Sequence, residues 1–174
     1  SMGAKRRMEV TKGLVIGLLE TAYRKRDRVA LLAFAGLRSR LVLPPTRSVR
    51  RAQRLLHDLA AGGRTPMAEA LQQARHLVMT ARRKELQQAV VVISDGRSNV
   101  AEKGADPVQA VMRELALLAQ EKSPVILLDA EEGPVRLGLM RHWSMRFGFV
   151  YARLADVQEM NGVGSIRTSA SQIA

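Results

Sequence analysis

Three short, nearly continuous apolar runs are the features that most constrain the fold of this 174-residue chain. They span residues 28–34 (RVALLAF), 88–94 (QAVVVIS) and 124–129 (PVILLD), and longer amphipathic segments separate them. Strands that are covered by helices on both faces have this composition. Strands that alternate with helices predict a doubly wound α/β domain, with a mainly parallel sheet and helices on both faces.

The rest of the chain fits this architecture. Apolar residues recur at three- and four-residue spacing in the intervening segments, which predicts helices over residues 8–26, 48–59, 66–83, 106–122 and 137–147. Residues 39–43 (SRLVL) predict an antiparallel edge strand that Pro44-Pro45 end. A last strand is expected at 148–154, and residues 155–174 are expected to be a disordered C-terminal tail. We therefore expect one domain over residues 1–154.

Composition excludes several functional classes. The chain has no cysteine, so disulfides, thiolate metal sites and cysteine nucleophiles are excluded, and a reducing, cytoplasmic compartment is favoured. No apolar run reaches the roughly 20 residues that span a bilayer, so we expect no membrane segment. No glycine-rich phosphate loop ends in Lys-Ser or Lys-Thr, which argues against ATP binding by this chain.

A net charge of +12 indicates an acidic partner. The basic residues form short clusters at predicted helix ends, and solvated helix ends are the plain alternative interpretation. Aromatic residues are only 3% of the chain, and no nucleic-acid-binding motif is present, so an acidic protein segment is favoured over nucleic acid. The residues that we expect to contact it are Arg24, Lys25, Arg26, Arg50, Arg51 and Arg54.

Two polar loops carry the candidate metal ligands. Asp95 directly follows the apolar run Val90–Ile93, at the carboxyl end of a predicted inner strand, where ligands of doubly wound sheets bind. A carboxylate there suits Mg²⁺ or Mn²⁺, although an Asp before Gly96 also forms turns. Thr65 precedes a helix, so its hydroxyl is either a neutral ligand or a helix cap, and the same ambiguity applies to Ser1.

Taken together, residues 1–3 (SMG), 62–66 (GGRTP) and 93–96 (ISDG) resemble the metal-ion-dependent adhesion site of von Willebrand factor A domains. That site has the form Asp-x-Ser-x-Ser, followed by a distant Thr and a later Asp. The resemblance implies that Ser1, Thr65 and Asp95 are metal ligands. It also implies that the first Asp and first Ser, together with the first central strand of the sheet, are missing from residues 1–154.

Further stretches, at 1–9, 26–30, 43–49 and 135–139, resemble the C-terminal domain of D-type subunits of magnesium and cobalt chelatases. This resemblance implies a non-catalytic, metal-dependent protein-interaction module. Its partners would be an AAA+ ATPase subunit and a large catalytic subunit that inserts Mg²⁺ or Co²⁺ into a tetrapyrrole. The cation of the adhesion-type site would take a carboxylate from a partner and would be distinct from the inserted metal.

Three other functions remain open from the residues alone. The chain could be a von Willebrand A domain that serves a different AAA+ ATPase, a basic nucleic-acid-binding domain, or a metal-dependent hydrolytic or phosphoryl-transfer enzyme. The enzyme hypothesis lacks a positioned base and a second acidic pair beside Asp95.

Overall fold

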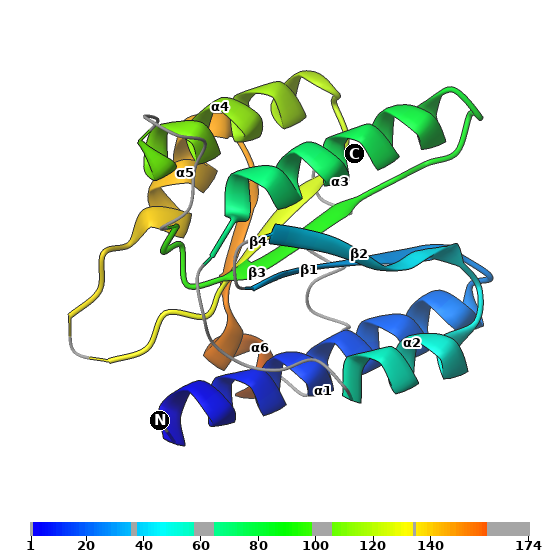
Figure 1. The fold of residues 1–174 in the computed structure, drawn as a ribbon, viewed down its shortest axis with the longest axis horizontal. Coiled ribbons are helices and arrows are strands. Elements are labelled where there is room, and N and C mark those ends of the chain that lie inside the picture. The colour runs from blue at the N-terminus through cyan, green and yellow to red at the C-terminus, as the bar shows by residue number, and fades with distance from the viewer. Residues whose placement is uncertain (1, 36–37, 58–64, 99–105, 134, 160–174) are drawn as a thin grey trace.

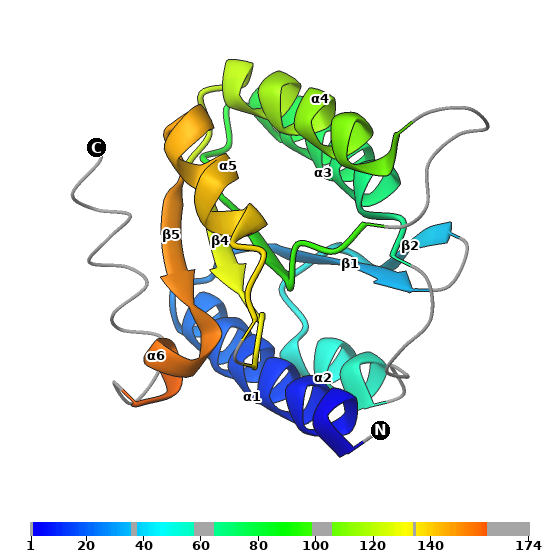
Figure 2. The same ribbon diagram turned by 90° about the vertical axis from the view of Figure 1, so that its left-hand side faces the viewer.

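The computed structural model describes residues 2–35, 38–57, 65–98, 106–133 and 135–159, and they form three layers (Figure 1). Strands occupy the middle layer, and helices cover both of its faces (Figures 1 and 2). One helical layer contains α1 (Met2–Arg24), α2 (Val49–His57) and α6 (Leu154–Glu159). The other contains α3 (Met67–Arg82), α4 (Pro107–Gln120) and α5 (Leu139–Phe147). The predicted α/β class is therefore confirmed.

A parallel sheet with the order β3-β4-β5 forms one part of the middle layer. Its strands are β3 (Val90–Ser94), β4 (Val125–Asp129) and β5 (Val150–Arg153). The register pairs Ser94 with Asp129 and Asp129 with Arg153, so the three strands end at the same edge. We call this the carboxyl edge. It places the loops that follow β3 and β4 next to each other.

An antiparallel hairpin forms the other part of the middle layer. Strands β1 (Val29–Ala35) and β2 (Arg38–Thr46) pair as the short turn between them predicts. The prediction that Pro44-Pro45 end the second strand was wrong, because β2 continues to Thr46. The register shifts between Val29 and Leu31, opposite these prolines. A bulge on an edge strand tolerates proline, because that strand need not donate every backbone hydrogen bond.

The strands that the structure describes form two separate sheets. Within the part of the chain that the structure describes, β1 pairs only with β2, and β3 pairs on one side only, with β4. This arrangement is what a doubly wound sheet without a first central strand looks like.

The main core lies between the parallel sheet and the α3–α4–α5 layer, around Trp143, Leu115 and Leu127, which are all fully buried. A second cluster lies on the α1 side and includes Leu154 and Val157 of α6. Helix α6 thus extends the regular structure beyond residue 154, the expected end of the domain, to Glu159, because these two apolar side chains are buried against α1 and β4. Residues 160–174 lie outside the described residues. None of the described helices has the length and apolarity to cross a bilayer.

Candidate functional site at the carboxyl edge

Asp95 lies in a tight loop directly after β3. Its Oδ1 atom accepts a hydrogen bond from the backbone N–H of Arg97 (3.1 Å), and the Ser94 hydroxyl oxygen accepts one from the N–H of Gly96 (3.1 Å). Gly96 has φ +75°, a conformation that glycine adopts without strain. Asp95 was expected to be either a turn residue or a metal ligand. Its Oδ1 atom forms the turn. Among the described residues, Oδ2 receives no hydrogen bond that would compete with a cation.

Thr65 lies directly before α3, and the structure joins its loop to the Asp95 loop. The Ser98 hydroxyl donates a hydrogen bond to the backbone carbonyl of Thr65 (3.1 Å). Pro66 occupies the N-cap position of α3 and makes no side-chain cap. The two loops therefore meet at one end of the sheet, as a shared site requires. Ser1 lies outside the described residues, and ligation of a metal by these three residues stays a prediction.

The donor set fits a hard cation but is small. A carboxylate oxygen and a hydroxyl oxygen are ligand types that Mg²⁺ binds, and Mg²⁺ commonly keeps several waters. Among the described residues, no group of three or more His, Cys, Asp or Glu side chains is arranged to hold a metal. A site that contains Thr65 and Asp95 would therefore have one charged protein ligand. Helix α1 begins on the same side of the molecule as the carboxyl edge (Figure 1).

The structure adds a second acidic group at this edge that sequence reasoning missed. Asp129 is buried at the end of β4, where its Oδ1 accepts the N–H of Glu131 (2.8 Å) and its Oδ2 accepts the hydroxyl of Tyr151 (2.9 Å). Burial, together with this bond to the Asp129 carboxylate, raises the pKa of Tyr151 to about 12. Asp129 is thus held by protein donors rather than presented to a ligand. Its position at the end of an apolar run, as for Asp95, was the available sequence signal.

Glu131 is the most constrained acidic side chain at this edge. Its side chain is only 2% exposed, and its two oxygens accept the backbone N–H groups of Leu137 (2.8 Å) and Gly138 (3.0 Å). Arg97 lies 3.8 Å from Oε1. Burial alone would raise the pKa of Glu131, but the two backbone hydrogen bonds and the positive charges of Arg97 and Arg136 hold it below its ordinary value. Glu131 is therefore an ionised group that joins two loops.

A hollow of about 100 Å³ opens beside these residues. Its lining includes Asp129, Glu131, Arg136 and Arg153, together with Val10 of α1. The hollow has room for a few water molecules but not for a drug-sized ligand, which needs several hundred Å³. The hollow is therefore too small to enclose a drug-sized ligand.

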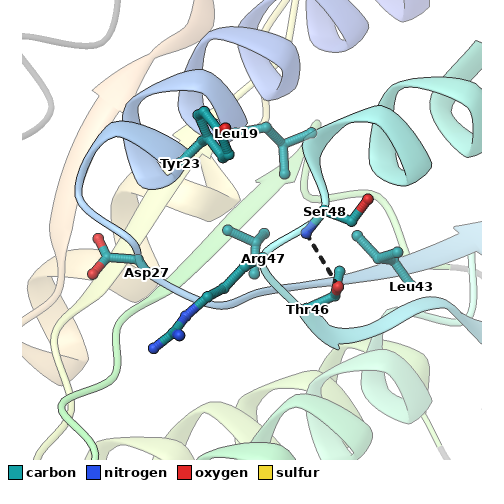
Figure 3. A pocket seen from close by; sticks show the side chains of 8 residues that line it. Leu19, Tyr23, Asp27, Leu43, Thr46, Arg47 and Ser48 are labelled. Atoms are coloured by element: carbon teal, nitrogen blue, oxygen red, sulfur yellow. Dashed lines mark hydrogen bonds between the residues drawn. The ribbon is translucent and has the colours of Figure 1, made fainter.

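The basic residues expected to contact a partner lie at the other end of α1. Arg24 ends that helix, and Lys25 and Arg26 lie in the turn that follows it. Arg50, Arg51 and Arg54 lie on α2, and all six side chains are exposed. Tyr23 and Asp27 lie near Arg47 and Ser48 around a small hollow, which shows that the end of α1 adjoins the start of α2 (Figure 3). This hollow has a volume of only about 10 Å³, barely enough for one water. We call this surface the basic end.

Comparison with known proteins defines the class of protein. The family model of the von Willebrand factor type A domain matches residues 1–97. The crystal structure of the SpRpn10 VWA domain has the same fold, with a TM-score of 0.64, 14% sequence identity, and coverage of 85% of this chain and 80% of that one. This chain belongs to the von Willebrand factor type A domain family.

Within that family, the chain is related to chelatase subunits. It is 38% identical over 135 residues to the magnesium-chelatase 60 kDa subunit of Cereibacter sphaeroides, which covers 75% of this chain and 24% of the relative. It is 43% identical over 109 residues to the 67 kDa subunit of Chlorobaculum parvum, covering 62% and 18%. The chain thus spans about a quarter or less of these relatives. The uncharacterized protein MJ0910 of Methanocaldococcus jannaschii is 37% identical over 161 residues, covering 91% and 92%.

Proposed function

We propose that this domain is a metal-dependent protein-interaction module of a chelatase complex. Thr65 and Asp95, with Ser1, would hold Mg²⁺ or Mn²⁺, and the cation would take a carboxylate from a partner protein. The partners would be an AAA+ ATPase subunit and a large catalytic subunit that inserts Mg²⁺ or Co²⁺ into a tetrapyrrole in the cytoplasm. The domain itself would not catalyse the insertion, in which the metal is cargo.

One observation carries this proposal: the Ser98–Thr65 hydrogen bond brings the Thr65 loop to the Asp95 loop at the carboxyl edge. Thr65 and Ser98 are 33 positions apart in the sequence, so the fold brings their loops together. Sequence similarity to magnesium-chelatase subunits supports the proposed chelatase complex, because two such subunits are 38% and 43% identical to the matched parts of the chain.

Electrostatics gives the reason why such a site would bind a carboxylate. One aspartate and neutral hydroxyl ligands leave a divalent cation with net positive charge, and an unfilled coordination position then attracts an anionic oxygen. The exposed basic end would add a second contact for acidic protein surface. Single exposed ion pairs contribute only about 0 to 1 kcal/mol, so the six clustered cations would have to act together.

A von Willebrand A domain that serves a different ATPase is the second candidate. The observation that favours it is the archaeal relative MJ0910, of which this chain covers 92%, so little of that relative extends beyond the matched domain. The basic nucleic-acid hypothesis has no comparable support.

Isothermal titration calorimetry tests the metal site directly. Mg²⁺ should bind the protein, and Asp95→Asn should lower its affinity at least about tenfold, because the variant loses the charged ligand. Asp27→Asn is the matched control, since Asp27 is an exposed aspartate at the basic end, and it should bind Mg²⁺ like the parent. Equal Mg²⁺ affinity of the parent and Asp95→Asn would refute the proposed ligand set.

A pull-down then tests the partner. A magnesium-chelatase AAA+ subunit should bind the immobilised domain in Mg²⁺ and be released by EDTA. Binding that is insensitive to EDTA and to Asp95→Asn would remove the cation from the proposed interface.

A further inference from the structure

The Glu131 carboxylate joins the two ends of the loop between β4 and α5. Glu131 opens the loop and accepts the N–H groups of Leu137 and Gly138, which close it just before α5. A buried carboxylate that lost these donors would be costly, so the loop ends are held together firmly. Arg136 adds a weaker contact, from its Nε to the carbonyl of Gly133 (3.4 Å).

The same carboxylate fastens the Asp95 loop to this one. Arg97 donates its backbone N–H to Asp95 and points its guanidinium at Glu131, 3.8 Å from Oε1. Gly96 packs so closely on α5 that a Cβ atom there would lie 3.1 Å from the Cβ of Leu139. The candidate ligand Asp95 and the β4–α5 loop therefore form one structural unit.

This unit presents apolar side chains to solvent. Val135 is 76% exposed and Leu137 is 59% exposed, although both belong to a loop that is fastened on either side of them. Scattered exposed apolar residues are ordinary on a protein surface. These two differ because they lie beside the exposed cations Arg97 and Arg136, and because the bonds of Leu137 and Gly138 to Glu131 fix the end of the loop that carries Leu137. A side chain whose backbone is already fixed loses less conformational entropy when it binds a partner.

We propose that Val135 and Leu137 form a second contact for the partner segment that docks at Asp95, and that this segment carries an apolar residue beside its acidic one. The proposal rests on the proposed function, because it extends the same interface. Arg97 and Arg136 are exposed beside this contact and can reach the acidic residue of the segment, while Glu131 and Glu132 offset part of their positive charge. Glu131 and Arg97 are positioning residues that keep the apolar contact and the Asp95 loop in register.

A random peptide library displayed on phage provides the test, with selection on the immobilised protein in Mg²⁺. Selected peptides should carry Asp or Glu with Leu, Ile, Val, Met or Phe within a few positions. Selection on Val135→Ser/Leu137→Ser should still enrich the acidic residue but lose the apolar one. Leu86→Ser is the matched control, because Leu86 is 44% exposed before β3, away from the carboxyl edge, and it should select the same peptides as the parent.

Affinities of the best peptide then measure the contact. Val135→Ser/Leu137→Ser should weaken binding about tenfold or more, since burial of one large apolar side chain is worth about that factor. Acidic peptides without an apolar neighbour, or equal affinity in the double variant, would overturn this proposal alone. Peptides without an acidic residue, or no enrichment at all, would overturn both the proposed function and this extension of it.

Discussion

Strands β4 and β1 have similar apolar sequences, VILLD and VALLAFA, but very different burial. All five residues of β4 are buried, whereas residues 29–34 of β1 are all only partly buried. Strand β4 pairs with β3 on one side and with β5 on the other, while β1 pairs only with β2 among the described residues. An apolar run therefore predicts a strand suited to a protein interior, but neighbours on both edges are needed to bury it.

Deleting one core side chain from each strand should show the largest difference. Leu127→Ala in β4 removes a side chain that is 0% exposed, and we expect a loss of about 2 to 5 kcal/mol in the free energy of unfolding. Leu31→Ala in β1 should cost less, because Leu31 is half-buried in the small cluster around Leu19 and Leu43. Urea denaturation followed by circular dichroism measures both. Equal losses would show that β1 is as well covered as β4.

Glu131→Gln tests how firmly the end of β4 is held. The variant keeps the shape of the side chain but loses the charge that accepts two backbone hydrogen bonds, so we expect a loss of about 1 to 3 kcal/mol at neutral pH. The pKa of Glu131 is lowered in the folded protein. Its contribution is therefore complete above the ordinary value near 4.5 and disappears as the pH falls through the lowered pKa.

Denaturation of the parent and Glu131→Gln across this acidic range checks the sign. The difference in stability between them should shrink as the pH falls. Glu132→Gln serves as the control, because the neighbouring Glu132 is exposed, and it should change stability much less. A difference that stays constant down to acidic pH would contradict an ionised Glu131 in the fold.

Tyr151→Phe should give the smallest effect. It removes the hydroxyl that donates to Asp129, and we expect a loss of about 1 kcal/mol at neutral pH. The pKa of Tyr151 is raised from 10 to about 12 because the fold favours the protonated hydroxyl. This contribution to stability is complete below pH 10 and is lost as the pH rises through about 12. Spectrophotometric titration of tyrosine should show one late transition in the parent that is missing from the variant.

The order of strands and helices was predictable because each element carries its own periodicity. The sequence also indicated that the Thr65 and Asp95 loops could meet at the carboxyl end of β3, and the Ser98–Thr65 hydrogen bond joins these two loops. Other features depend on contacts that are distant in sequence. Pro44-Pro45 are tolerated because β2 is an edge strand with a bulge. Helix α6 forms because Leu154 and Val157 are buried in the cluster on the α1 side of the sheet. The Glu131–Arg97 pair joins residues 34 positions apart, which no local pattern reveals.

Helix α1 sets the separation of the two proposed binding surfaces. Val10 lines the hollow at the carboxyl edge, and Arg24 ends the helix at the basic end. With a rise of 1.5 Å per residue, these positions are about 20 Å apart along a rigid rod. A partner segment must contain about six fully extended residues to reach both surfaces. Shorter segments can bind only one surface at a time, whereas a longer one gains avidity, because its second contact becomes intramolecular.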